Sequence, residues 1–321
     1  MRYITLKAGD LEYTSLIKYE KKLVKNMKRY QRILVAVDGS KEATKALNRG
    51  INLAKRYDSR LFICHVVESK EYSRVPVYRE EIKQAAVENG LEILKAYEKT
   101  AAEAEVKDVV TIMKRGVSPQ KMIAKEIIPL YNIDLAITGA SGLGLIESYL
   151  LGSVSAGMVH LAGCDVMVVK NKAFTENYRR ILVAIDESEM SMKAFETAIT
   201  IAREQESEIS AVHVLHTPLA HSVEQFRDDI QDIYMKNGEL LLERYQKMAV
   251  ERGMQHMPIS MEYGAPKFIL PKETAVLFRA DLIVAGATGA GVEKGLHLGS
   301  VSEGIVRRAA CDVLIIRNKP N

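Results

Sequence analysis

Residues 30–38 of the chain read Tyr-Gln-Arg-Ile-Leu-Val-Ala-Val-Asp, and residues 178–186 read Tyr-Arg-Arg-Ile-Leu-Val-Ala-Ile-Asp. The second stretch repeats the first at an offset of 148 residues. The repeat continues downstream, where it pairs His65 with His213, Gly116 with Gly264 and, after the loss of one residue, Asp134 with Asp281, Gly139 with Gly286, Gly152 with Gly299 and Asp165 with Asp312. A period of this length is too long for a solenoid and indicates a whole domain used twice.

Strands and helices are predicted to alternate through each copy. Short apolar runs rich in Val and Ile are typical of strands that are buried on both faces of a parallel sheet. In the first copy these runs are Ile33–Val37, Leu61–Val67, a strand ending near Gly116, Leu135–Thr138 and Val166–Val169. In the second copy they are Ile181–Ile185, Ile209–Leu215, a strand ending near Gly264, Leu282–Ala285 and Val313–Ile316.

Helical patterns separate these runs, the clearest being Glu42–Tyr57 and Glu80–Ala104 in the first copy, and Ser191–Gln205 and Val223–Arg252 in the second. Such alternation favours an α/β fold of two tandem, doubly wound parallel sheets with right-handed crossovers. The predicted division is a basic extension over residues 1–27, one domain over 28–172 and a second over 176–319, joined by a short polar linker.

Bulk composition excludes several classes of protein. The chain has 321 residues, of which 47% are hydrophobic and 27% charged, which is ordinary for globular domains. A net charge of +4, from 45 basic and 41 acidic residues, gives no electrostatic argument for nucleic acid as a partner. Three scattered cysteines argue against a disulfide framework. We find no signal-peptide pattern and no apolar run long enough to span a bilayer, and expect a cytoplasmic protein.

A glycine motif follows the fourth strand of each copy with identical spacing. The first reads Gly-Ala-Ser-Gly over 139–142, then nine residues, then Gly-Ser-Val over 152–154. The second reads Gly-Ala-Thr-Gly over 286–289, nine residues, then Gly-Ser-Val over 299–301. Glycines at a strand's carboxyl end let backbone N–H groups approach a phosphate, and a Gly-Ser helix start adds the positive end of the helix dipole. Asp38 and Asp186 end the first strands and are expected to face the same crevice, where a carboxylate accepts hydrogen bonds from ribose hydroxyls.

The Gly-x2-Gly-x9-Gly-Ser pattern after an opening Ile-Leu-Val-Ala-x-Asp strand resembles the universal stress protein family, over about residues 28–319. The resemblance implies an adenine nucleotide alpha hydrolase-like fold with five parallel strands per domain in the order 3-2-1-4-5. It also implies that domains pair through their last strands, so that the tandem forms a pseudo-dimer within one chain; whether two chains pair into a homodimer is left open. Some family members bind ATP or AMP, and others lack the motif and bind neither.

Carried over residue by residue, the resemblance implies one adenine-nucleotide site in each domain. A valine would contact adenine through its main chain, and the side chain of an aspartate would contact the ribose. The first comprises Asp38, Val66, Gly139, Gly142, Gly152, Ser153 and Val154. The second comprises Asp186, Val214, Gly286, Gly289, Gly299, Ser300 and Val301. Mg²⁺ would enter with ATP, since no His, Asp or Glu cluster has metal-ligand spacing.

The two loops differ in charge. The nine residues after Gly142 include Glu147 and no basic residue, whereas those after Gly289 include Lys294 and His297. A phosphate tail prefers the basic loop, so we expect the second domain to hold a triphosphate better and the first to bind AMP or nothing.

Other polar residues are interpreted structurally. His65 and His213 read as strand residues hydrogen-bonded to backbone, and Cys164 and Cys311 as small packing residues. Ser153 and Ser300 read as phosphate contacts or helix caps. The apolar and lysine-rich stretch over 11–29 reads as a short packed helix or a tail rather than a membrane-surface helix.

The leading functional hypothesis is a stress-response regulator that binds ATP or AMP and acts through conformational change and protein partners that the sequence does not identify. No catalytic residue or metal site is assigned, because no positioned base, arginine finger, P-loop or nucleophile elbow is recognisable. The alternatives are an interaction scaffold that no longer binds nucleotide and a slow ATPase.

Overall fold

The ten predicted strands form one continuous sheet. The computed structural model describes residues 29–69, 79–141, 151–170, 174–216, 227–289 and 298–318. The strands of the first copy are β1 (Arg32–Ala36), β2 (Arg60–Glu68), β3 (Val109–Gly116), β4 (Leu135–Gly139) and β5 (Asp165–Val169). Those of the second are β6 (Arg180–Ala184), β7 (Glu208–Leu215), β8 (Ile259–Tyr263), β9 (Leu282–Gly286) and β10 (Asp312–Ile316).

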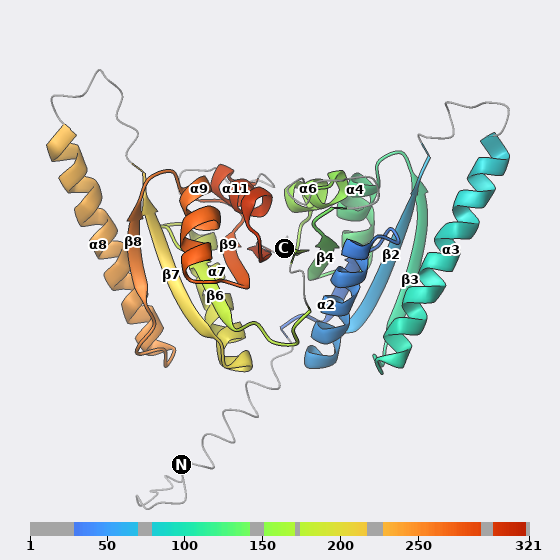
Figure 1. Cartoon of the computed structure of the whole chain (residues 1–321), viewed down its shortest axis with the longest axis horizontal. Helices are drawn as coiled ribbons and strands as arrows, with labels where there is room; N and C mark the ends of the chain where they lie inside the picture. Colours follow the sequence, from blue (N-terminus) through green and yellow to red (C-terminus); the bar gives the residue numbers. More distant parts are fainter. Residues whose placement is uncertain are drawn as a thin grey trace, which may run out of the picture.

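The sheet order is β3-β2-β1-β4-β5-β10-β9-β6-β7-β8, which is the expected order 3-2-1-4-5 in each copy. Within each copy all neighbours pair in parallel, and the two copies meet where β5 and β10 pair antiparallel, with Leu314 opposite Met167. The expected pairing of the last strands within one chain is therefore confirmed. Figure 1 shows the two halves on either side of this junction, with the long helices α3 (Arg79–Glu103) and α8 (Arg227–Glu251) along the outer flanks.

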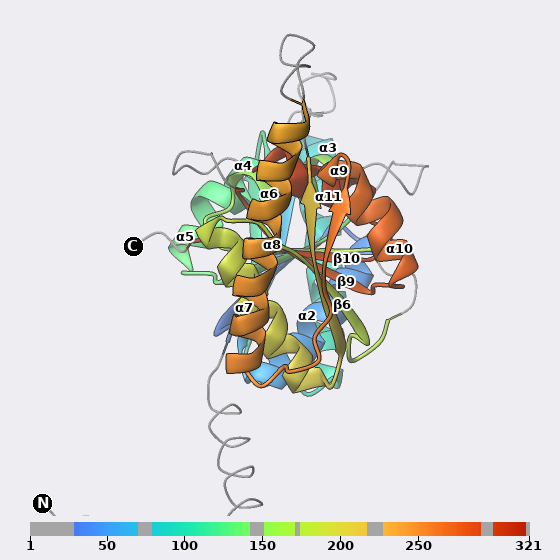
Figure 2. The same cartoon turned by 90° about the vertical axis from the view of Figure 1, so that its left-hand side faces the viewer.

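Helices cover both faces of the sheet, as the alternating pattern predicts. One face carries α2 (Lys41–Tyr57), α3, α7 (Glu189–Gln205) and α8. The other carries α6 (Ser153–Leu161), α11 (Ser300–Arg308) and two helices with a π-helical middle turn, namely α4–η3–α5 (119–130) and α9–η5–α10 (266–277). In the view of Figure 2 the orange helix α8 lies in front of the sheet.

Helices α2 and α7 begin and end as their sequences direct. Ser40 and Ser188 are the N-caps, and their hydroxyls accept from the backbone N–H of residues 43 and 191. Each helix ends at an acidic residue in the left-handed conformation, Asp58 with φ 51° and Glu206 with φ 56°. These matched ends place both helices identically against the first strand of their copy.

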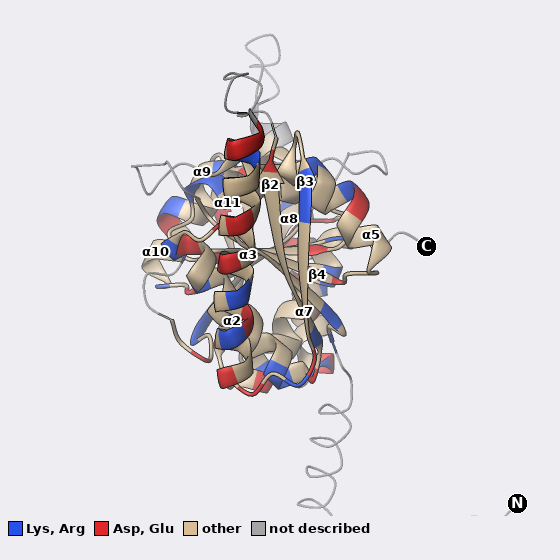
Figure 3. Ribbon diagram, turned by 90° about the vertical axis from the view of Figure 1, so that its right-hand side faces the viewer, with Lys and Arg blue, Asp and Glu red and all other residues tan. Residues whose placement is uncertain are grey.

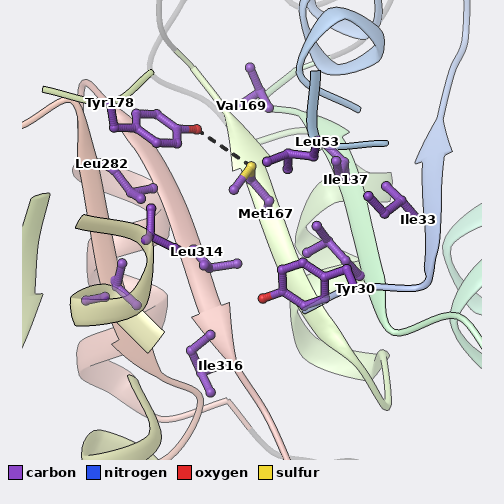
Figure 4. Packing of buried hydrophobic residues seen from close by; sticks show 14 of the residues in the cluster. Tyr30, Ile33, Leu53, Ile137, Met167, Val169, Tyr178, Leu282, Leu314 and Ile316 are labelled. Atoms are coloured by element: carbon purple, nitrogen blue, oxygen red, sulfur yellow. Dashed lines mark hydrogen bonds between the residues drawn. The ribbon is translucent and has the colours of Figure 1, made fainter. Parts of the chain in front are cut away.

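The hydrophobic core runs through the junction between the copies. Figure 4 shows Met167 and Val169 of β5 beside Leu314 and Ile316 of β10, all buried in one cluster. Because β5 and β10 pair with each other, neither domain has an exposed sheet edge at this side. The two copies are thus joined as one hydrophobic unit rather than as two domains on a tether.

Charges on the surface are mixed in sign. Figure 3 shows Lys, Arg, Asp and Glu interspersed along the flank that carries α3. No helix in the described part of the chain is long and apolar enough to cross a bilayer. The predicted extension over residues 1–27, Gly142, Glu147, Lys294 and His297 lie outside the described residues, and the predicted domain boundaries stay a prediction.

Candidate functional site

Each copy forms a cleft at the carboxyl ends of its strands. The first cleft has a volume of about 680 Å³ and the second about 710 Å³. The structure brings six predicted residues together in the first cleft, Asp38, Val66, Gly139, Gly152, Ser153 and Val154. It brings all seven together in the second, Asp186, Val214, Gly286, Gly289, Gly299, Ser300 and Val301. The binding roles of these residues stay a prediction.

The strand-end aspartates are held at the cleft by local hydrogen bonds. The backbone N–H of Ser188 donates to Asp186 Oδ1 at 2.8 Å, and that of Ser40 donates to Asp38 Oδ1 at 3.0 Å. In the second copy the Tyr245 hydroxyl also donates to the Asp186 carbonyl oxygen at 2.9 Å. Burial raises the pKa of Tyr245 to about 12, so this donor stays protonated at neutral pH. The side chain and the backbone carbonyl of Asp186 are therefore both held in place.

The helices that begin at the clefts have no side-chain cap. Gly299 is the N-cap of α11, with φ −67° and ψ 151°, and Gly152 is the N-cap of α6, with φ −62° and ψ 154°. Neither makes the side-chain cap bond that Ser40 and Ser188 make in α2 and α7. Ser153 and Ser300 are the first helical residues, so their interpretation as caps is wrong. Among the described residues no N-cap side chain accepts from the first N–H groups of either helix, and these groups carry the positive end of the helix dipole.

Two contacts tie each of these helices to its strand end. In the second copy the Gly299 N–H donates to the Ala287 carbonyl at 2.7 Å, and the Ser302 hydroxyl donates to the Gly286 carbonyl at 2.6 Å. The first copy repeats them, from Gly152 to Ala140 at 2.8 Å and from Ser155 to Gly139 at 2.6 Å. These contacts fix the start of each helix against the end of its strand.

The histidine and cysteine interpretations are confirmed. The Nδ1 atom of His65 lies 2.8 Å from the Val37 carbonyl oxygen, and that of His213 lies 3.0 Å from the Ile185 carbonyl oxygen. Cys164 and Cys311 are buried, and burial raises the thiol pKa of Cys311 to about 12. A thiol that remains protonated at neutral pH is a packing group rather than a nucleophile.

Two further parts of the cleft walls were not predicted as site residues. The long helices contribute Asn89 and Asn237, and the helices with a π-helical middle turn contribute their first residues, Pro119 and Pro266. The sequence could have indicated the two asparagines, because each precedes a glycine in the middle of a long helix. Glycine destabilises a helix, so its presence there indicates close packing against a neighbour. At Gly90 an added Cβ would lie 2.9 Å from His65 Cδ2.

The clefts contain no obvious catalytic machinery among the described residues. The described lining of neither cleft includes Lys or Arg, the side chains that stabilise a phosphoryl group in transfer. Within the same residues there is no group of three or more His, Cys, Asp or Glu side chains that could hold a metal ion. Any Mg²⁺ in these clefts would need phosphate oxygens as ligands.

Comparisons with known proteins agree with the duplicated architecture. The universal stress protein family matches twice, over residues 29–170 and 177–317. A Staphylococcus aureus (strain USA300) protein whose name assigns it to the universal stress proteins is 39% identical over 150 residues, which are 47% of this chain and 90% of the relative.

Two solved structures share the whole tandem fold. A universal stress protein from Archaeoglobus fulgidus DSM 4304 superposes with a TM-score of 0.63 at 22% identity, covering 89% of this chain and 96% of that one. A Pseudomonas aeruginosa PAO1 protein of unknown function gives a TM-score of 0.63 at 18% identity, covering 91% and 94%. At this identity the likeness concerns the fold alone. With both matches of the family spanning nearly all of the described residues, the chain belongs to the universal stress protein family and carries two of its domains in tandem.

Proposed function

We propose that the chain is a stress-response regulatory protein that binds an adenine nucleotide, ATP or AMP, in its two clefts and acts through conformational change and partner binding. The observation that carries the proposal is the helix start at Gly299. There, N–H groups with no side-chain cap open into the same cleft as the Asp186 carboxylate and Val214, near the end of its strand. Helix starts of this kind bind phosphate.

The chemistry of the second cleft matches the parts of a nucleotide. The Asp186 carboxylate accepts hydrogen bonds from ribose hydroxyls, and the main chain of Val214 offers a donor and an acceptor to the edge of adenine. The N–H groups of Ser300 and Val301, with the Ser300 hydroxyl, face the phosphates. Asp38, Val66 and Ser153 repeat this arrangement in the first cleft.

Regulation rather than turnover is favoured by the absence of Lys and Arg from the described walls of both clefts. The preference of the second domain for a triphosphate rests on Lys294 and His297 in the sequence alone. A cytoplasmic location also stays a prediction.

The test is calorimetric titration of ATP with Mg²⁺, and of AMP, into nucleotide-stripped protein. Asp186→Ala is expected to remove binding at the second cleft and Asp38→Ala at the first. The control is Asp108→Ala, which removes an exposed carboxylate paired with Arg60 at the amino end of the sheet and should bind like the wild type.

Failure of the wild type to bind either nucleotide would reject the proposal and favour the interaction scaffold. Sustained release of ADP by the wild type, lost in Asp186→Ala, would favour the slow ATPase instead.

A further inference from the structure

The two clefts have corresponding walls that differ in a few side chains. In each, the long helix of the outer flank lines the cleft, and the internal repeat aligns three of its lining positions between the two copies. In α3 these positions are Ala86, Asn89 and Ile93, and in α8 they are Tyr234, Asn237 and Leu241. The asparagine is identical and the third residue is aliphatic in both. The first position differs, because it is Ala86 in the first cleft and Tyr234, with an aromatic ring, in the second.

The face of α8 that carries Tyr234 is directed at the cleft by its packing. Leu241 is buried, and at Gly238 an added Cβ would lie 2.5 Å from Met261 Sδ, so this part of the helix lies directly on the sheet. Tyr234, Asn237 and Leu241 are spaced at i, i+3 and i+7 and therefore share that face. Tyr234 lies about two turns before Leu241 and so lines the mouth of the cleft rather than its floor.

Tyr234 lines the second cleft and is also exposed. Its exposed fraction is 42%, compared with 5% for Leu241 on the same helix face. Aromatic rings at the mouth of a cleft offer a flat surface on which another flat ring can stack, and such base–aromatic contacts contribute about 1–3 kcal/mol per base. The first cleft offers only the methyl group of Ala86 at this place.

We infer that Tyr234 is a specificity-determining residue that stacks on the aromatic base of the ligand. The second cleft therefore binds nucleotides more tightly than the first cleft does, and prefers them to sugar phosphates without a base. This inference rests on the proposed nucleotide function and names the group that separates the two clefts. The helix start at Gly299 recognises the phosphate of any sugar phosphate, whereas Tyr234 recognises the base. The first cleft, with Ala86, discriminates less between the two kinds of ligand.

The experiment isolates each cleft and moves the ring between them. Asp38→Ala leaves the second cleft for titration, and Asp186→Ala leaves the first. AMP and ribose 5-phosphate, which has the sugar and phosphate but no base, are titrated calorimetrically into both. In the second cleft Tyr234→Ala should weaken AMP about tenfold and leave ribose 5-phosphate unchanged. Tyr234→Phe should restore AMP affinity, because the ring is kept.

The reciprocal variant Ala86→Tyr should strengthen AMP binding in the first cleft by a similar factor. Ile233→Ala is the control, because that side chain is 60% exposed on the same helix and does not line the cleft.

The outcomes separate the two proposals. AMP binding that Tyr234→Ala leaves unchanged would overturn the stacking inference and leave the nucleotide function standing. An equal loss of AMP and ribose 5-phosphate would also overturn it, because the effect would then not concern the base. If neither AMP nor ATP binds the wild type, the proposed function fails and this inference fails with it.

Discussion

Gly289 and Asp186 meet across the second cleft. A Cβ added at Gly289 would lie 2.8 Å from the Asp186 Oδ2 atom, closer than a Cβ approaches an oxygen atom, whereas no backbone atom is as near. We predict that Gly289→Ala displaces the carboxylate and weakens adenine-nucleotide binding in the second cleft, on the order of tenfold, as expected for loss of hydrogen bonds to a charged group. Calorimetric titration in the Asp38→Ala background measures it. Stability should change little because only a side-chain end moves.

Gly286, three residues earlier, meets a different obstacle. Its added Cβ would lie 2.8 Å from the Met190 carbonyl carbon, which is helix backbone and cannot rotate away. Gly286→Ala is therefore predicted to lower the free energy of unfolding by about 1–3 kcal/mol, as for an overpacked core. Urea denaturation checks this, and a variant as stable as the wild type would show that α7 shifts freely.

These two glycines mark what the sequence can and cannot predict for single residues. The glycines of the motif indicate positions where another group lies too close for a Cβ. The sequence does not indicate whether that group is backbone or a side chain. At Gly139 and Gly286 an added Cβ would meet the backbone of the first helix of each copy, whereas at Gly289 it would meet the Asp186 carboxylate. The distinction requires the relative positions of strands and helices that lie about 100 residues apart.

At the scale of the element, helix α11 has a glycine where α7 has a serine cap. The backbone angles of Gly299 suit an aspartate at the N-cap. We therefore predict that Gly299→Asp raises the free energy of unfolding by a few tenths of a kcal/mol. The new carboxylate would occupy the first N–H groups and repel phosphate, so ATP and AMP binding in the second cleft should be lost.

Thermal unfolding and titration of the same Gly299→Asp preparation test this pair of opposite effects. Gly152→Asp is the matched variant for the first cleft. A variant that is stabilised and still binds AMP with the wild-type affinity would contradict the role of the helix start.

Sequence patterns predicted most elements well and the π-helical turns not at all. The predicted helix Glu80–Ala104 corresponds to α3, Arg79–Glu103, and the strand predicted to end near Gly116 is β3. These long patterns repeat often enough to define a period. The π-helical turn η3, Ile123–Ile127, covers five residues, which is too short a stretch to distinguish its period from that of the flanking α-helix.

In the whole molecule, Arg49 of α2 extends from the first copy into the second. Its guanidinium is fully buried, lies over the Tyr178 ring at 4.3 Å and pairs with Asp312, Nε to Oδ2 at 3.7 Å. Asp312 also accepts from the Tyr178 hydroxyl at 2.8 Å. Arg49→Met leaves that carboxylate buried without its cation, and should lower the free energy of unfolding by about 3 kcal/mol.

Urea denaturation of Arg49→Met measures this loss, with Lys55→Met, an exposed position on the same helix, as the control. Equal stability of the two variants would show that Arg49 adds nothing to the junction.

The junction separates what could be predicted from what could not. The pairing of β5 with β10 was predicted from the family resemblance. Arg49 has Thr197 at the equivalent position of the second copy, so repetition gives no indication of its role. Its partner Asp312 lies more than 250 residues away in the chain, and only the folded arrangement brings the two together.

Lys170 links the junction to the second cleft. It follows β5, and its Nζ donates to the carbonyls of Val306 and Ala309 at 2.6 and 2.9 Å, at the C-terminal end of α11. Burial lowers the pKa of Lys170 to about 8, although Cys311 and Asp312 act in the opposite direction and Lys272 adds to the lowering. Arg317 takes the same place in the second copy, donating to the Val159 carbonyl of α6.

The lowered pKa gives the junction a pH dependence of known sign. Between pH 8 and 10.5 the unfolded chain keeps a proton on Lys170 that the folded chain has released, so the free energy of unfolding rises with pH through this group. Comparison with Lys170→Met removes the contribution of all other titrating groups, tyrosines included. The stability of the wild type relative to Lys170→Met should therefore increase between pH 7.5 and 9.5, on the order of 1 kcal/mol.

Relative to Lys170→Met, Lys170→Arg should show no such increase, because arginine stays charged throughout this range. Parallel pH profiles for the wild type and Lys170→Met would mean that Lys170 titrates in the folded protein as it does in the unfolded chain, and that its ammonium group is hydrated rather than held against the end of α11.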